Sequence, residues 1–277
     1  SRRTRGSRGE ASRGQRGGGL GLPMPPTASG CLARALFASA DVAQWERCHA
    51  AYDQAIAHVA SLRRNGDKLV TLDSWWRKEW PAQARKPKGL TRDALAKAAT
   101  WKLTRGQWRP LMPQIEGNLE EAVAAAWKAA IARRGSSQSD AGNDAADTVA
   151  ALSASLAGVG PATASAILAP CFEDTPFMSD EALDAAGCPR KYDLKTYRLF
   201  AEQLVSKALA LGGAPWTAER VGRALWACKV LGLDTADSGS ASGRKAAAEP
   251  ARVTVATASS AVKRPAGPPM KKRRTAT

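Results

Sequence analysis

Apolar side chains recur every three or four positions between residues 31 and 234, and no stretch alternates strictly as a half-buried strand would. This pattern predicts an all-α domain. Asn65-Gly66, Pro81, Pro110 and Gly212-Gly213 interrupt the pattern, and each marks the end or the start of a helix. The predicted helical segments cover residues 31–64, 72–80, 92–103, 113–131, 145–156, 162–169, 194–211 and 218–231.

Local signals indicate where several helices begin and what separates them. Thr91, Asp193 and Thr217 each precede a periodic apolar run and are predicted N-caps. Residues 135–144 (GSSQSDAGND) are polar and contain glycine, which predicts a loop. Tryptophan is buried on average, so one cluster is assigned to the core. This cluster consists of Trp75, Trp76 and Trp80.

Both ends of the chain differ in composition from the part between them. Residues 1–30 hold six arginines and one acidic residue, among Gly, Ser and Pro. Residues 235–277 hold nine Lys/Arg and two acidic residues, among Ala, Ser, Gly and Pro. Neither segment carries enough apolar surface to offset the entropy of ordering, so both are predicted to be disordered tails. One folded domain is therefore expected over residues 31–234.

The formal net charge of the chain is +16, and the two tails carry +12 of it. The charge of the domain is concentrated, because residues 85–109 hold eight Lys/Arg against one acidic residue, Asp93. A local excess of this size is typical of a surface that faces a polyanion, although a solvated helix face has the same composition. A nucleic-acid partner and a solvated helix face therefore both fit this charge.

The cysteines and histidines show no spacing typical of metal ligands. The five cysteines are scattered without a Cys-x-x-Cys pair, and His49 and His58 have no ligating neighbour in sequence. No metal site and no disulfide framework is expected. No apolar run is long enough to span a bilayer, so no membrane partner is expected either.

The two tails carry signals that bear on location. Lys263-Arg264 and Lys271-Lys272-Arg273-Arg274 flank a Pro/Gly spacer, a pattern that predicts a nuclear localisation signal. A basic tail that binds nucleic acid has the same composition. The Arg/Ser-rich N-terminal segment also resembles an organelle transit peptide, so the nucleus is the expected location with an organelle as the alternative.

Residues 156–164 (LAGVGPATA) predict a tight connection between two short helices. Gly158 and Gly160 permit backbone angles closed to other residues, and Pro161 suits the first turn of the following helix. The amides of such a turn and the helix N-terminus converge on one point, which favours an anion such as a nucleic-acid phosphate. A helix connection that binds no ligand has the same residue types.

This segment closely resembles the helix-hairpin-helix element of DNA-repair and replication proteins over residues 145–169, and a looser likeness extends to residue 231. In helix-hairpin-helix DNA glycosylases an essential Asp follows the second helix after a short loop. Asp180 stands at that place, twenty residues after Gly160. The resemblance implies an all-α, helix-hairpin-helix DNA glycosylase-like domain whose partner is DNA.

By this resemblance Asp180 stabilises the developing sugar cation, or activates water, while a flipped base leaves. Hairpin carbonyls near Leu156 and Val159 would hold a monovalent cation beside the phosphate, and no other cofactor is expected. The residues expected to bind the DNA phosphate are Gly158, Val159, Gly160 and Thr163.

The sequence departs from this family in several respects. Ala162 stands where bifunctional members have a nucleophilic Lys, so Schiff-base lyase chemistry is not expected. The four-cysteine spacing of an iron–sulfur cluster is absent, and Glu181-Ala182-Leu183 follows the Asp where the family often has Thr-His. Ser179-Asp180-Glu181 is also a good helix N-terminus, which gives Asp180 a structural alternative. If Asp180 is catalytic, the expected enzyme is a monofunctional DNA N-glycosylase.

Residues 101–110 (WKLTRGQWRP) interleave indoles with basic residues. Trp101 and Trp108 are predicted to be buried, because tryptophan is mostly buried on average. The basic residues are predicted to be exposed and to contact a second stretch of DNA backbone. These residues are Lys102, Arg105 and Arg109.

Two other functions fit the same sequence. A non-catalytic member of the fold would recognise DNA structure or scaffold a complex, with Asp180 as a helix cap. An RNA-associated protein would bind through its tails and use the domain for protein contacts. Asp180→Asn separates the first from an enzyme, and deletion of residues 1–30 and 235–277 separates the second.

Overall fold

The computed structural model describes residues 28–134 and 141–233, which form helices joined by loops and contain no strand. The all-α prediction is confirmed for this part of the chain. None of these helices is long and apolar enough to cross a membrane. The elements, of which η1 is a π-helix, are α1 (Ala28–Ala38), α2 (Val42–Ala50), α3 (Tyr52–Ser61), α4 (Gly66–Ser74), η1 (Trp75–Glu79), α5 (Trp80–Ala84), α6 (Arg92–Arg105), α7 (Met112–Glu116), α8 (Glu120–Arg133), α9 (Ala141–Ser153), α10 (Pro161–Leu168), α11 (Asp180–Ala185), α12 (Leu194–Ala210) and α13 (Ala218–Leu231).

Several predictions fall on residues 1–27, 135–140 and 234–277, which lie outside the described residues. These are the disordered tails, the nuclear localisation signal, the transit-like N-terminal segment and RNA binding through the tails. They stay predictions. The first helix begins at Ala28, inside the segment that the composition assigns to the N-terminal tail.

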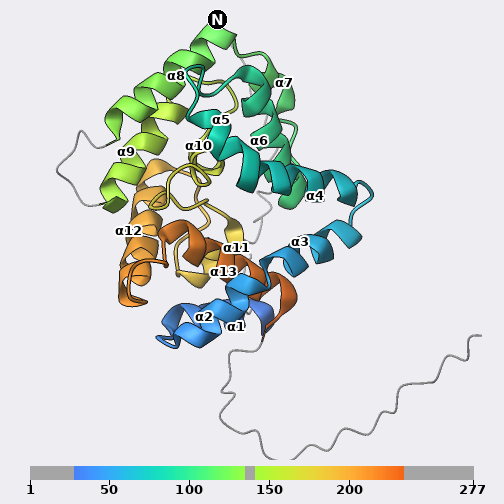
Figure 1. Ribbon diagram of the computed structural model, residues 1–277, viewed down its shortest axis with the longest axis vertical. Coiled ribbons are helices and arrows are strands. Elements are labelled where there is room, and N and C mark those ends of the chain that lie inside the picture. The colour runs from blue at the N-terminus through green and yellow to red at the C-terminus, as the bar shows by residue number, and fades with distance from the viewer. Residues whose placement is uncertain (1–27, 135–140, 234–277) are drawn as a thin grey trace, which may run out of the picture. The chain divides into compact units, whose positions relative to one another are not determined.

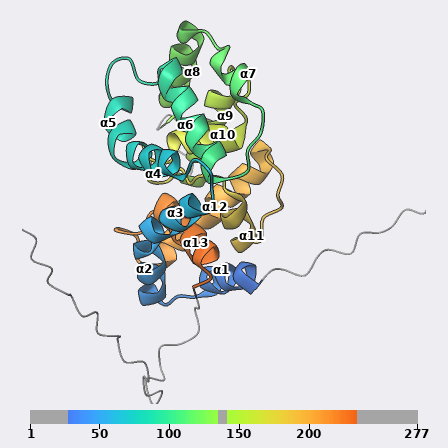
Figure 2. The same cartoon turned by 90° about the vertical axis from the view of Figure 1, so that its right-hand side faces the viewer.

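The helices gather into two groups, which both views of the chain show (Figures 1 and 2). In one group α13 packs against α1, α2, α3 and α11. In the other, α9 packs against α8 and α10, and α6 packs against α4, α7 and α10. The long helix α12 contacts both α9 and α13, so it joins the two groups.

The N-terminal half differs from the predicted pattern in several places: α4 begins at Gly66 and not at residue 72, and the predicted segment 113–131 is divided into α7 and α8. The helical run over residues 31–64 is divided into three helices, because Asp41 accepts a hydrogen bond from the amide of Ala43 and so begins α2. The break at Asn65-Gly66 is confirmed. The predicted helix stop at Pro81 is wrong. Pro81 lies in the first turn of α5, where its missing N–H costs no hydrogen bond.

The π turn brings the predicted tryptophan cluster into the core. Trp75, Trp76 and Trp80 are all buried, which confirms that prediction. Trp76 and Trp80 donate from Nε1 to the carbonyls of Ala166 and Ile167, at 2.7 and 2.8 Å. These carbonyls lie in the last turn of α10, where no helical N–H remains to bind them. The two indoles therefore fix α10 against the N-terminal half of the chain.

The predicted loop over residues 135–144 is wrong at residues 141–144, which belong to α9. Gly142 approaches α12 so closely that a Cβ there would lie 2.9 Å from Cα of Glu202. This close helix packing outweighs the low helix propensity of glycine and the polar neighbours. The predicted N-caps are confirmed, since each side chain accepts from the amide three residues on. These caps are Thr91, Asp193 and Thr217.

Candidate functional site

The turn between α9 and α10 contains two glycines that differ in whether another residue could take their place. Gly158 has a φ of 73°, and a Cβ there would lie 3.0 Å from Cγ1 of Ile115, so only glycine fits. Gly160 has a φ of −91° and a ψ of −178°, which any residue adopts. The prediction that Gly160 needs unusual backbone angles is therefore wrong. Nothing lies within 4 Å of its Cβ position, which leaves open space before the N-terminus of α10.

A buried side chain that sequence reasoning missed, Asn118, holds this turn. Its Nδ2 donates to the carbonyls of Ile115 and Ala157, at 2.9 and 3.0 Å, and its Oδ1 accepts from the amide of Ala157 at 2.9 Å. Asn118 therefore binds both backbone groups of a residue next to Gly158. In sequence, Asn118 follows Gly117 and reads only as an ordinary turn residue.

The segment that leads to Asp180 is fixed beside the turn. The amide of Met178 donates to Oγ of Ser165 in α10 at 3.1 Å, and Oη of Tyr197 donates to the carbonyl of Pro176 at 3.2 Å. Ser179 then accepts from the amide of Ala182 and caps α11. Asp180 is the first residue of α11, and these hydrogen bonds hold the backbone that carries it.

Asp180 is half-buried and accepts a hydrogen bond from Oη of Tyr192 at 2.5 Å. Burial and this hydrogen bond raise the pKa of Tyr192 to about 12, so the phenol stays a donor at neutral pH. The guanidinium of Arg109 lies over the Tyr192 ring, 5.8 Å from its centroid. Arg109, Tyr192 and Asp180 therefore form a chain of contacts that links the loop after α6 to α11.

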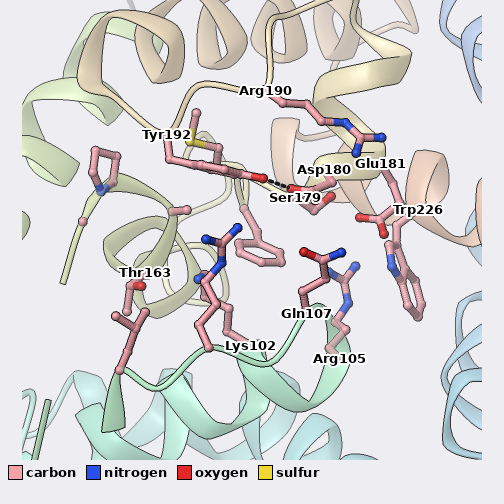
Figure 3. Close-up of a pocket in the computed structure, with 18 of the residues that line it drawn as sticks. Lys102, Arg105, Gln107, Thr163, Ser179, Asp180, Glu181, Arg190, Tyr192 and Trp226 are labelled. Atoms are coloured by element: carbon pink, nitrogen blue, oxygen red, sulfur yellow. Dashed lines mark hydrogen bonds between the residues drawn. The ribbon is translucent and has the colours of Figure 1, made fainter. Parts of the chain in front are cut away.

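A cavity of about 970 Å³ lies among these elements, and Figure 3 shows the side chains around it. Its walls come from the end of α3, the end of α6, the turn before α10 with the first residues of α10, the start of α11, the loop before α12 and one face of α13. All eight residues that the sequence selects as candidates line it. They are Lys102, Arg105, Arg109, Gly158, Val159, Gly160, Thr163 and Asp180.

The basic run at the end of α6 is arranged differently from the prediction. Trp101 is buried as predicted, but Trp108 is 72% exposed and Arg105 is only 7% exposed. Trp101 packs against Trp76 and Phe177 in the core, where its Nε1 donates to the buried Asp73 at 3.0 Å. The exposure of Trp108 and Arg105 is the reverse of the prediction because of tertiary contacts, since aromatic rings of segments distant in sequence cover Arg105.

Lys102 is half-buried in the wall of the cavity, and Arg109 is exposed as predicted. Burial lowers the pKa of the Lys102 ammonium, and the nearby charge of Arg109 lowers it further. The Asp180 carboxylate acts in the opposite direction and raises it. The charges of Arg109 and Asp180 therefore both act on the Lys102 ammonium.

Charges that line the cavity are mostly basic, with six Lys/Arg and two acidic residues. Asp184, behind the wall, binds two of the six. Its carboxylate accepts from Nζ of Lys229 at 2.6 Å and from Nε of Arg190 at 2.7 Å. Burial alone would raise the pKa of Asp184, but these two hydrogen bonds outweigh it and lower the pKa to about 2.

No group of three or more His, Cys, Asp or Glu that could hold a metal ion occurs within residues 28–134 and 141–233. The carbonyl of Leu156 accepts from the amide of Val159 inside the turn, and the monovalent cation expected there stays a prediction. Comparison of the chain with protein-family models, with curated proteins and with solved structures found no match.

Proposed function

We propose that the protein binds DNA through the turn before α10 and takes an extruded nucleotide into the cavity, with the architecture of helix-hairpin-helix DNA glycosylases. One observation carries this proposal. The basic run at residues 102–109, selected from its composition, lines the same cavity as the turn and the carboxylate that were selected together by their spacing. A cavity with a few convergent polar groups is the usual form of a ligand site.

The phosphate side of the site is the open space at Gly160. A phosphate oxygen there would meet the N-terminus of α10 without a side chain in the way. Lys102 and Arg109, which line the same cavity, add positive charge. Since these groups address the backbone and not the base edges, we expect binding that is independent of sequence and that weakens with salt.

Asp180 would carry the chemistry of base release. In this reaction the C1′–N bond breaks, the base leaves with the bonding electrons and is protonated by solvent, and water adds to C1′. The carboxylate of Asp180 would stabilise the cation at C1′ and accept the proton of the attacking water. The hydrogen bond from Tyr192 would hold the carboxylate in one orientation during this step.

A second function, DNA recognition without base release, is favoured by a specific observation. Asp180 is the first residue of α11 and is already bound by Tyr192, as expected for a carboxylate that stabilises a helix start. The same turn and the same cavity would then recognise an extruded nucleotide and leave it intact.

DNA binding is tested with the full chain and two duplexes, one plain and one with an abasic-site analogue, at two salt concentrations. We expect tighter binding to the analogue. Gly160→Asp places a negative charge in the phosphate space, yet Asp is a good N-cap, so the fold should persist. We expect this variant to weaken binding about tenfold through charge repulsion. Gly160→Ala is the matched control and should bind like the wild type, and equal binding by all three proteins would contradict the proposal.

Base release is tested separately, with duplexes that each carry one damaged base. We expect Asp180→Asn to lose about a hundredfold or more of the release rate while it keeps DNA binding. Glu181→Gln changes the neighbouring carboxylate of the same cavity and serves as the control. Release by wild type and by Asp180→Asn at equal rates would exclude the catalytic role. Binding without any release would favour the second function.

A further inference from the structure

Arg105 is the least accessible charged side chain that lines the cavity, with 7% of its surface exposed. Its buried Nε has no hydrogen-bond acceptor among the described residues. None of the ion pairs in this part of the chain includes it. A buried guanidinium whose donors are unused costs free energy, so an incoming group with acceptors would gain strongly here.

Three aromatic rings hold the Arg105 guanidinium in place. Its Cζ lies 4.0 Å from the ring centroid of Trp226, 5.1 Å from that of Phe177 and 5.3 Å from that of Trp101. Figure 3 shows Arg105 beside Gln107, both rising from the end of α6 toward Asp180. Rings on several sides restrict the rotation of the side chain, so its donors are oriented before any ligand arrives.

Two buried carboxylates of this region, Asp73 and Glu219, are bound to other groups. Asp73 accepts hydrogen bonds from Tyr52, Trp101 and Arg77. Glu219 pairs with Arg223 at 2.6 Å. Both carboxylates therefore have hydrogen-bonded partners of their own, and neither forms an ion pair with Arg105.

The surroundings of Arg105 favour a planar ligand over a phosphate. Phe177 and Trp226 line the cavity and lie against the Arg105 guanidinium, and the half-buried Phe177 presents apolar surface that suits the face of a base better than a strongly hydrated tetrahedral anion. A guanidinium is a rigid fork of N–H donors, and it matches two adjacent acceptors in one plane. Guanine offers such a pair, O6 and N7, whereas adenine offers one acceptor beside an amino donor and cytosine offers an amino donor.

We propose that Arg105 selects a guanine-type base, one with two adjacent hydrogen-bond acceptors on one edge, as the extruded nucleotide that enters the cavity. This inference rests on the proposed function, since it concerns the base taken into the same site. Arg105 binds the O6/N7 edge with two parallel N–H donors, and the half-buried Phe177 beside it contacts the face of the base.

The test measures equilibrium binding of the full chain to duplexes that differ in one unpaired, bulged nucleotide. A bulged base leaves the stack without the loss of a base pair, so the comparison isolates the cavity. We expect a bulged guanine to bind about tenfold tighter than a bulged adenine, cytosine or thymine. A bulged 7-deazaguanine keeps O6 but lacks the N7 acceptor, and we expect it to lose most of this preference.

Variants at Arg105 assign the preference to this side chain. Arg105→Met and Arg105→Lys should bind all four bulges equally, since Lys keeps the charge but not the fork. Arg92→Met is the control, because Arg92 is exposed on the same helix and lies outside the cavity. If circular dichroism shows that Arg105→Met is unfolded, Arg105→Lys and the 7-deazaguanine duplex still decide.

The outcomes separate this inference from the function on which it rests. Preference for the abasic analogue over plain duplex, with equal binding of the four bulges, would overturn the role of Arg105 and leave the proposed function standing. A guanine preference that survives in both Arg105 variants, or 7-deazaguanine bound as tightly as guanine, would overturn it as well. No distinction between any of these duplexes would overturn both.

Discussion

The two sides of the cavity differ in whether their charged side chains form ion pairs. On the α6 side, Lys102, Arg105 and Arg109 have no carboxylate at ion-pair distance within the described chain. On the α11 side, Asp184 binds both Arg190 and Lys229. Unpaired cations in a cavity wall contribute little to the fold of the free protein, whereas a carboxylate that binds two cations contributes to it. The α6 side is therefore suited to bind a ligand, and the α11 side stabilises the helix that carries Asp180.

The same contrast appears between two arginines that line one small buried space. Arg105 and Arg223 both contact it, together with Tyr52 and Glu219. Arg223 is paired with the buried Glu219, whereas Arg105 forms no ion pair within the described residues and lies against aromatic rings, and its charge lowers the pKa of Glu219 less than that of Arg223 does. Removal of each arginine should therefore change stability in opposite directions.

The largest effect is expected from Arg223→Met. It leaves the carboxylate of Glu219, which is 6% exposed, buried without its partner, and should lower the free energy of unfolding by about 3 kcal/mol. Burial raises the pKa of Glu219, and Arg223 lowers it. Loss of Arg223 therefore raises it further, so the variant should lose more stability at pH 8 than at pH 5. Urea denaturation at both pH values measures this.

Arg220→Met is the matched control on the same helix. Arg220 pairs with Glu46, whose side chain is 44% exposed and stays hydrated when the arginine is lost. We expect a change below about 1 kcal/mol for this exposed pair. Similar losses in the two variants would show that the burial of Glu219 does not decide the effect.

A smaller loss is expected from Asp184→Asn, which removes the paired charge of the α11 side. Two charge-assisted hydrogen bonds are weakened at a partly exposed site, so we expect a loss of about 1–2 kcal/mol at pH 7. The pKa of Asp184 is lowered to about 2 from 3.8, so its stabilisation is present above about pH 4 and is lost as the pH falls toward 2. Asp184→Asn should lack this acid-sensitive component in urea denaturation. Asp53→Asn, at a 77% exposed carboxylate, should keep it.

On the α6 side the sign should reverse. Arg105→Met removes a buried charge without hydrogen bonds and keeps a side chain of similar length, so we expect a gain of about 1 kcal/mol in the free energy of unfolding. Arg92→Met, at an exposed position of the same helix, should leave stability unchanged. A clear loss of stability in Arg105→Met would mean that the contacts with the three rings outweigh the cost of burying the charge.

Much of the fold could be predicted from the sequence because it depends on local signals. The caps at Thr91, Asp193 and Thr217 act within one helical turn, and the structure confirms all three. The turn at residues 154–160 depends on Gly158, a position where only glycine fits. Asp180 could be selected by its distance along the chain from this turn, without knowledge of the cavity.

The rest depends on contacts between distant segments. Arg105 and Trp108 look alike in a basic, indole-rich run, and only Phe177 and Trp226 decide which of the two is covered. The role of Asn118 depends on a turn nearly forty residues later, with which it exchanges hydrogen bonds. Periodicity and composition carry no information about such pairings, so burial of charge and anchoring of the turn appear only in three dimensions.

The smallest expected effect tests the comparison of the two sides most directly, because charges on both sides of the cavity change the pKa of Lys102. Burial and Arg109 lower its pKa, and Asp180 raises it. Arg109→Gln should therefore raise the pKa of Lys102, and Asp180→Asn should lower it further. Reductive methylation with a ¹³C label, followed by NMR titration of the Lys102 signal, measures the shift, and Lys97 on the same helix outside the cavity should be unaffected. Opposite shifts in the two variants would establish that the unpaired cations and the carboxylate act on one shared space. Shifts in the same direction would mean that the two sides do not meet at Lys102.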